Sequence, residues 1–153
     1  MRGETHHNAP RRTNESEQLL SESNVEVIRG LYDAMAAGDV EGALGRMSPE
    51  IVWMEAENFP YADGNPYVGP DAVLGGVFAR LVGEWDGFGV AVDELLDAGD
   101  TVVMLGRYTG TCKATGKAQN PQIVHVWRLE GGKITRFQQH VDTLHVARVM
   151  GAV

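Results

Sequence analysis

The C-terminal part of the chain carries two stretches of alternating apolar and polar residues, one on either side of Gly131-Gly132. Glycine readily takes the positive φ angles of a tight turn, so the pattern predicts a hairpin of two antiparallel strands. Alternation places His125 and Trp127 on one face of the first strand, and on the second it groups His140 with Asp142 if no bulge intervenes. A histidine and a carboxylate near an aromatic ring make a poor core, and they indicate one wall of a lined pocket.

The length, charge and cysteine content limit the classes of function. With 153 residues, 43% of them hydrophobic, the chain suits one domain with a real core. A net charge of -8 disfavours nucleic acid and anionic membranes as partners, because both are bound by basic surfaces. Cys112 is the single cysteine, which rules out an internal disulfide, and the polar N-terminus lacks the apolar stretch of a secretory signal. We therefore expect a cytoplasmic protein with no nucleic-acid or membrane partner.

Residues 1–21 are polar with little periodicity, so we expect a disordered tail, followed by a single domain over residues 22–153. Helices come first and a run of strands follows. This order predicts an α+β fold in which a cone-shaped, curved antiparallel sheet packs on N-terminal helices and encloses a cavity. The expected elements are helices over 24–37, 40–47 and 71–82, a strand over 51–55, a loop over 58–70, and strands over 87–98, 101–112, 118–130 and 133–142.

Four short motifs follow one another along the chain: Ala37-Gly38-Asp39, Gly69-Pro70-Asp71-Ala72, Gly131-Gly132-Lys133-Ile134 and Val141-Asp142-Thr143. Their order resembles the SnoaL-like family of the nuclear-transport-factor-two-like superfamily, whose relatives include ketosteroid isomerase and limonene epoxide hydrolase. The resemblance implies an apolar pocket for a small hydrophobic molecule and a homodimer formed through the sheet. Members include isomerases, polyketide cyclases, dehydratases, epoxide hydrolases and non-catalytic binding modules, so the fold alone does not settle the function.

The resemblance suggests roles for three ionisable residues. Glu55 resembles the general-base carboxylate of ketosteroid isomerase, and His125 resembles the position of its protonated Asp. Asp142 resembles the last-strand Asp of the epoxide hydrolases and of the SnoaL-type cyclases. Our hypothesis is an acid/base pair of Asp142 and His125, with Glu55 as a second base and His125 as donor to an enolate oxygen. No cofactor or metal is implied. An apolar pocket should raise the pKa of such a carboxylate toward neutrality.

Departures from the family patterns narrow the expected reaction. Tyr32 lies one residue off the register of the isomerase's catalytic Tyr, which argues against steroid isomerisation itself. Arg107 resembles the first residue of the hydrolase Arg-x-Asp motif, but Thr109 stands where the Asp should be. A hydroxyl cannot protonate an opening epoxide as a carboxylic acid does. The favoured interpretation is an isomerase, cyclase or dehydratase acting on a small carbonyl or polyketide-like compound, and an epoxide hydrolase is less favoured.

Structural explanations stay open beside this hypothesis. Asp142 can simply N-cap a final helix, and His125 can be a hydrogen-bonded core histidine. Both explanations lead to a non-catalytic ligand-binding or dimerisation module on the same fold. His140 can face either the pocket or the dimer interface. The residues expected to bind the substrate are Tyr32, Trp53, Phe59, Tyr61, Phe78, Arg107, Trp127 and His140.

Overall fold

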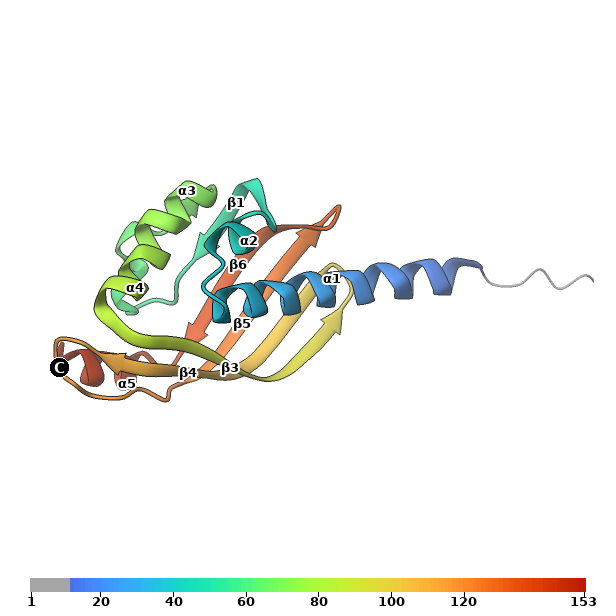
Figure 1. Ribbon diagram of the computed structural model, residues 1–153. Helices are drawn as coiled ribbons and strands as arrows, with labels where there is room; N and C mark the ends of the chain where they lie inside the picture. The colour runs from blue at the N-terminus through green and yellow to red at the C-terminus, as the bar shows by residue number, and fades with distance from the viewer. Residues whose placement is uncertain (1–11) are drawn as a thin grey trace, which may run out of the picture.

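The computed structural model describes residues 12–153, with side chains from Asn24 onward. Helices cover the concave face of a single curved sheet (Figure 1). Much of the expected tail, up to residue 11, lies outside the described residues. From Arg12 the backbone is helical, so the first helix begins earlier than the predicted start at Asn24. The elements are α1 (Arg12–Ala36), α2 (Val40–Leu44), β1 (Met47–Met54), η1 (Pro60–Gly64), β2 (Tyr67–Val68), α3 (Pro70–Val73), η2 (Leu74–Phe78), α4 (Ala79–Glu84), β3 (Trp85–Ala98), β4 (Thr101–Cys112), β5 (Gln122–Glu130), β6 (Lys133–Val141) and α5 (Thr143–Met150).

The six strands follow the order β2-β1-β6-β5-β4-β3, and the sheet is not closed into a barrel. The strands from β3 to β6 pair antiparallel with their successive neighbours, as predicted. The predicted α+β fold with a curved sheet on N-terminal helices is confirmed, and the sheet is antiparallel except that β1 lies parallel to β6. Parallel neighbours need a long crossover connection, and the segment from β2 to β5 provides one. This pairing brings the end of β1, and Glu55 just after it, beside the C-terminal hairpin.

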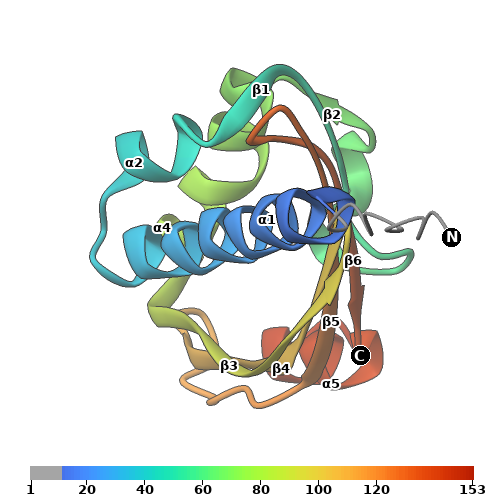
Figure 2. The ribbon, with the colours of Figure 1, turned by 90° about the vertical axis from the view of Figure 1, so that its right-hand side faces the viewer.

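α1 lies along the concavity, and the strands curve around it (Figure 2). Leu31 is fully buried and Tyr32 nearly so, because apolar residues recur on one face of the helix. Gly38 follows the helix at φ 71°, and Asp39 caps α2 by accepting a hydrogen bond from the backbone N–H of Gly42 at 2.9 Å. The predicted passage from helix through glycine to a second helix is confirmed. No described helix, including the 25-residue α1, is long and apolar enough to cross a membrane.

The predicted hairpin is present, with Gly131 at φ 56° and Gly132 at φ 78° in its turn. The register between β5 and β6 shifts by one residue close to the turn. Leu129 pairs with Ile134, but the next residue of β5, Arg128, pairs with Arg136, so Thr135 is an extra residue in β6. Beyond this bulge His125 lies opposite Gln139. Because a shift of one residue reverses which side chains face inward, the even-numbered residues from 136 to 140 face away from the core.

The convex face of the sheet carries a patch of paired apolar side chains. Val103 lies opposite Val126, and Leu105 lies opposite Val124, on β4 and β5. All four side chains are half-buried in the isolated chain. The neighbouring edge strand β3 carries Leu96, which is exposed and lies opposite Val103. The outer face is therefore more apolar than a fully solvated sheet face usually is.

Candidate active site

A small inner cavity lies between the concave face of the sheet and the helices. Its volume is about 20 Å³, enough for one water-sized group. Aromatic and aliphatic side chains form most of its wall, and its polar groups come chiefly from Tyr32, Glu55, Tyr108, His125 and Gln139. Five of the predicted substrate-binding residues line it: Tyr32, Trp53, Phe59, Phe78 and Trp127.

His125 stands at the centre of the polar part of this cavity, with a residue exposure of 4%. Its Nδ1 lies 2.7 Å from the hydroxyl of Tyr32, and its Nε2 lies 2.7 Å from the hydroxyl of Tyr108. Both ring nitrogens are therefore occupied by tyrosines. The predicted role of His125 as a direct donor to a substrate does not fit this geometry, because neither nitrogen is free to contact a ligand.

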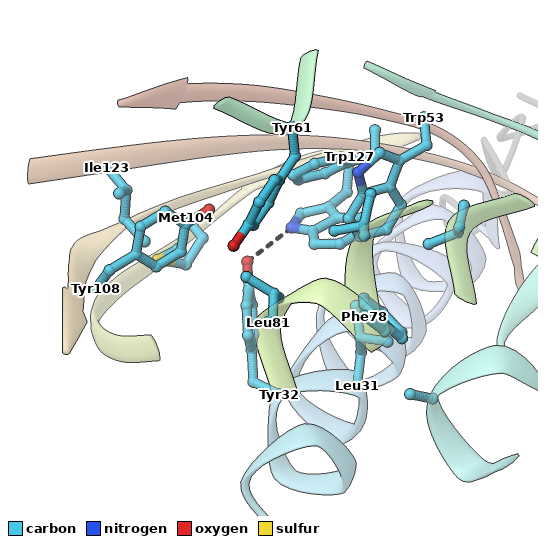
Figure 3. Close-up of a cluster of buried hydrophobic side chains, with 14 of the residues drawn as sticks. Leu31, Tyr32, Trp53, Tyr61, Phe78, Leu81, Met104, Tyr108, Ile123 and Trp127 are labelled. Carbon is cyan, nitrogen blue, oxygen red and sulfur yellow. Dashed lines mark hydrogen bonds between the residues drawn. The ribbon is translucent and has the colours of Figure 1, made fainter. Parts of the chain in front are cut away.

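Two further side chains extend the network at its ends. The indole N–H of Trp127 donates to the hydroxyl of Tyr32 at 2.8 Å, and Figure 3 shows the two groups pointing toward each other. The amide nitrogen of Gln139 donates to the hydroxyl of Tyr108 at 2.7 Å, and its oxygen accepts from the backbone N–H of Ala56 at 3.0 Å. The network thus connects α1, β4, β5 and β6 with the end of β1.

Glu55 follows β1 and is 2% exposed. Its backbone is held by Asn65, whose side chain accepts from the Glu55 N–H at 2.9 Å and donates to its carbonyl at 2.8 Å. Within the part of the chain that the structure describes, the carboxyl Oε2 and the nearby Trp53 Nε1 have no hydrogen-bond partner. Burial raises the pKa of Glu55 from 4.5 to about 8, and the Trp53 indole and the charge of Arg80 only partly oppose this. A carboxyl with such a pKa exchanges its proton near neutral pH.

The other titratable groups of the cavity are neutral at neutral pH. Burial, and secondarily the charge of His140, lowers the pKa of His125 to about 3. Burial also raises the pKa values of Tyr32 and Tyr108 well above the usual range for tyrosine. The cavity therefore holds a neutral imidazole between two protonated phenols, with Glu55 as the group that can change charge.

A second, larger hollow of about 270 Å³ adjoins the inner cavity. It is almost entirely apolar, with Val40 and Ala43 from the α2 region on one side and Trp85 at the start of β3 on the other. Phe78, Leu81 and Phe88 line both spaces, as do Met35 and Val90, and so form the partition between them. The π-helical turn η2 carries Phe78, and such turns are frequent at functional sites.

Tyr61 is buried but lines neither space, which corrects its prediction as a substrate contact. Its hydroxyl donates to the carboxylate of Glu84 and accepts from the indole N–H of Trp85 at 3.1 Å. The guanidinium of Arg80 lies 4.3 Å from the centre of its ring. These contacts fasten η1 to α4 and to the start of β3, so Tyr61 supports the cavity wall from behind.

Asp142 is exposed and lies outside the cavity, so the predicted pairing with His125 is wrong. Its carboxylate accepts a hydrogen bond from the backbone N–H of His145 at 3.1 Å and caps α5. The backbone N–H of Asp142 is bonded to the carbonyl of Gln122 at 3.1 Å, three residues along β5 from His125. The bulge at Thr135 causes this separation, since it turns the even-numbered positions of β6 to the outer face.

Two other predicted contacts also face outward. Arg107 is half-buried on the convex face, where its guanidinium donates to the backbone carbonyl of Asn120 at 2.8 Å. His140 is exposed on the same face, opposite Val124. Thr109 is exposed as well. Alternation along β4 turns Tyr108 inward and its neighbours outward, so the hydrolase-like Arg107 does not reach the cavity.

Sequence reasoning missed two polar residues of the site, Tyr108 and Gln139. Alternation gave a signal for Tyr108, because it shares the parity of Val102 and Met104 in the same predicted strand, and all three prove to be buried. Gln139 had no such signal, because counting across the two-residue turn places Gln138 opposite His125. Only the bulge brings Gln139 to the inner face.

Comparison with known proteins gives a consistent assignment. The profile of the SnoaL-like domain family matches residues 28–137. An NTF2-like protein from Burkholderia thailandensis is 40% identical with a TM-score of 0.79, and the alignment covers 83% of this chain and 96% of that one. An NTF2-like protein of unknown function from Burkholderia pseudomallei is 28% identical with a TM-score of 0.77, covering 84% of this chain and 97% of that one.

TerC, in a structure co-crystallised with polyporic acid, is 27% identical with a TM-score of 0.76, and the alignment covers 84% of this chain and 98% of that one. No functionally curated protein matches the chain. The family profile spans most of the domain, from α1 to β6, and the solved structures share the sheet and its helices over nearly their whole length. The chain therefore belongs to the SnoaL-like domain family.

Proposed function

We propose that the protein is a cofactor-independent acid/base enzyme that moves a proton on a small hydrophobic carbonyl compound, as an isomerase, cyclase or dehydratase. The observation that carries the proposal is the carboxyl of Glu55, which is 2% exposed and lines the inner cavity. Its Oε2 lacks a partner among the described residues. Structural carboxyls in a protein interior are paired, since an unpaired one is costly. A buried carboxyl with a raised pKa in a cavity is typical of a catalytic group.

The proposed chemistry uses Glu55 twice. As a carboxylate it takes a proton from the carbon next to the carbonyl, and a tyrosine hydroxyl of the network donates a hydrogen bond to the enolate oxygen. Return of the proton from Glu55 to a conjugated carbon completes an isomerisation. Transfer of the same proton to a departing β-hydroxyl releases water. Attack of the enolate carbon on a second carbonyl of the substrate forms a ring, and the resulting alkoxide takes the proton back from Glu55. The pKa of about 8 suits both uptake and return of the proton near neutral pH.

The two adjoining spaces suggest the shape of the substrate. The inner cavity of about 20 Å³ accepts one small polar group, and the outer hollow of about 270 Å³ accepts an apolar body. A substrate with a carbonyl head and a hydrophobic ring system fits this division. The side chains that separate the two spaces, such as Phe78, Leu81 and Phe88, would shift so that one molecule could occupy both. Co-crystallisation of TerC with polyporic acid supports an organic small molecule as the occupant of such a fold.

Hydrogen–deuterium exchange at carbon tests the proposal without knowledge of the natural substrate. We expect the protein to accelerate exchange of the α hydrogens of 2-tetralone, a bicyclic ketone, in D₂O, as followed by loss of their ¹H NMR signals. The rate should rise with pH, reach half its maximum near pH 8 and level off above it, because the base must be ionised. Glu55→Gln should lower the protein-dependent rate by about 10²–10⁴-fold, the usual contribution of a general base.

Asp142→Asn is the matched carboxylate-to-amide variant, and it should exchange at the wild-type rate because Asp142 lies outside the cavity. Loss of exchange in Asp142→Asn with retention in Glu55→Gln would show that the wrong carboxylate has been chosen. Quenching of Trp53 and Trp127 fluorescence would show whether the wild-type protein binds 2-tetralone. If it binds the ketone but does not accelerate exchange of its α hydrogens, the non-catalytic binding module is favoured instead.

We also propose a homodimer formed through the convex face of the sheet. The apolar pairs Val103–Val126 and Leu105–Val124 support it, since they would be covered in a dimer. Val126→Asp should shift the protein from dimer to monomer in light scattering coupled to size exclusion, because it places a charge in the centre of the patch. Val68→Asp, at an exposed position of β2, is the control and should leave the mass unchanged. An unchanged mass for Val126→Asp would exclude this interface.

A further inference from the structure

The hydrogen bonds around His125 can be counted. Nδ1 is bonded to the hydroxyl of Tyr32 and Nε2 to that of Tyr108, each at 2.7 Å. Each tyrosine oxygen also accepts one N–H, from Trp127 at 2.8 Å and from Gln139 at 2.7 Å. Trp127 has only a donor to offer, and the amide oxygen of Gln139 is already used by Ala56 N–H. The directions of three of these hydrogen bonds are therefore fixed, and only the two between His125 and the tyrosines depend on the tautomer.

A neutral imidazole has one N–H and one lone pair. One tyrosine must therefore donate its hydroxyl hydrogen to the bare nitrogen, and the other must accept from the N–H. The accepting tyrosine keeps its own hydrogen for some other acceptor. Since Tyr32 and Tyr108 both line the inner cavity, the network leaves one hydroxyl hydrogen available to a ligand there. The tautomer of His125 decides which tyrosine supplies it.

The position of Glu55 favours Tyr108 as that donor. Glu55 immediately precedes Ala56, whose backbone N–H donates to Gln139 at 3.0 Å, and Gln139 donates to the Tyr108 hydroxyl at 2.7 Å, so Glu55 lies at the Tyr108 end of the network. The carboxyl group carries an acceptor oxygen in both protonation states, and it attracts the positive end of a nearby O–H toward its own side of the cavity. The hydrogen bonds from Trp127 through Tyr32 and His125 to Tyr108 then run in one direction, and Gln139 donates to Tyr108 from the other side. Such a chain strengthens its last donor, because each bond polarises the next.

We propose that His125 is a positioning residue, held as the Nε2–H tautomer, that commits the hydroxyl hydrogen of Tyr108 to an oxygen atom of a ligand in the inner cavity. The ligand class is a molecule that presents a carbonyl or enolate oxygen as a hydrogen-bond acceptor. The assignment as an enolate rests on the proposed function; the donor itself and the tautomer do not. Tyr32 then serves to hold the bare Nδ1 and does not contact the ligand as a donor.

The ring nitrogens of His125 give a direct test on the wild-type protein. Long-range ¹H–¹⁵N correlation at pH 7, assigned by comparison with His125→Gln, should show a protonated Nε2 and an unprotonated Nδ1. A protonated Nδ1, alone or together with Nε2, would overturn the proposal. The measurement needs no substrate and no turnover, so its outcome is independent of whether the protein proves to be an enzyme.

A matched pair of tyrosine variants tests the donor. Tyr108→Phe should weaken binding of carbonyl-¹³C-labelled 2-tetralone by about 5–10-fold, the worth of one neutral hydrogen bond, and should move its bound ¹³C signal upfield. Tyr32→Phe should lower the affinity and the shift less than Tyr108→Phe does, because Tyr32 donates to His125 and not to the ligand. Equal losses in the two variants, or loss in Tyr32→Phe alone, would contradict the assignment.

Two substitutions of His125 separate positioning from simple packing. His125→Gln can still donate an N–H to Tyr108 and should retain part of the bound carbonyl shift. His125→Leu fills space without a donor and should lose it. Equal shifts in the two variants, with both folded by circular dichroism, would show that His125 does not orient the hydroxyl. If the wild-type protein shifts the carbonyl ¹³C signal of bound 2-tetralone but does not accelerate exchange of its α hydrogens, the proposed catalysis is rejected and this inference stands.

Discussion

Replacing Glu55 by Gln is expected to raise the free energy of unfolding above pH 8 by about 5 kcal/mol and to leave it unchanged below pH 4.5, since each pKa unit corresponds to about 1.36 kcal/mol. The pKa of Glu55 is about 8 in the folded protein and 4.5 ordinarily. Between these values the folded state keeps a proton that the unfolded chain has lost. Folding then requires proton uptake, so wild-type stability falls as the pH rises through this window. Gln has no proton to lose and avoids the fall.

His125 shapes the acidic side of the same profile. Its pKa is about 3 in the folded protein against 6.5 ordinarily, so below pH 6.5 the unfolded chain binds a proton that the folded state does not. Stability therefore falls as the pH decreases toward 3. Between pH 4.5 and 6.5 the slopes from Glu55 and His125 oppose each other. These two groups place the stability maximum of the wild-type protein in that mildly acidic window.

Urea unfolding at pH 4 and pH 9, followed by tryptophan fluorescence, measures the effect. Glu57→Gln is the control, because it removes an equal charge from the same segment. Glu57 lies two residues after Glu55, and its side chain is exposed. Its stability should follow the wild-type dependence on pH. Parallel profiles for wild type and Glu55→Gln would mean that Glu55 ionises normally in the folded protein, and the acid/base proposal would lose its main support.

Replacing Gln139 by Leu is expected to lower the free energy of unfolding by about 3 kcal/mol, because each buried polar group left without a partner costs about 1–3 kcal/mol. Gln139 is 2% exposed and lies between β6 and the end of β1. Its oxygen is the acceptor for the Ala56 N–H, and its nitrogen is a donor to the Tyr108 hydroxyl. Leu has a similar volume, so packing is largely kept while both bonds are lost.

Gln122→Leu is the matched control for this substitution. Gln122 lies in β5 with an exposed side chain, and its change should stay within about 0.5 kcal/mol of wild type, as surface substitutions usually do. Chemical denaturation at a single pH compares the three proteins. A Gln139→Leu protein as stable as wild type would indicate that the two hydrogen bonds contribute little and that the network is not under structural constraint.

The order of the elements and the fold class could be predicted because they follow from local patterns. The apolar spacing in α1, the Gly38-Asp39 transition and the glycines of the hairpin turn each act within a few residues. The parallel placement of β1 beside β6 could not be predicted, because it depends on a pairing between segments far apart in the sequence. Glu55, His125 and five of the predicted lining residues do reach the inner cavity.

The error at Asp142 has one cause, the extra residue Thr135. A two-residue turn and regular alternation would place even-numbered residues of β6 on the inner face with His125. The bulge reverses this parity, bringing in Gln139 and turning out His140 and Asp142. Nothing in the local sequence marks Thr135 as a bulge residue, since it is a favourable strand former. Its position is fixed by packing in the folded sheet, where its hydroxyl donates to the carbonyl of Arg128 at 3.2 Å.

The network around His125 shows another limit of sequence reasoning. The sequence identified His125 as a residue of interest, but the roles of its two nitrogens depend on Tyr32 from α1 and Tyr108 from β4. These residues are 93 and 17 positions away along the chain. A side chain's chemistry is set by its neighbours in space, and alternation within one strand does not supply them.

The partition between the two spaces has a consequence for how such proteins diverge. Phe78, Leu81 and Phe88 belong to a helical segment and to the edge strand β3, while Glu55 and His125 belong to other elements. Substitution of a partition side chain can admit or refuse a bulkier compound without moving a proton-handling group. Selection on substrate range and selection on reactivity therefore act on separate residues, so a new preference can arise through single substitutions while the older chemistry continues.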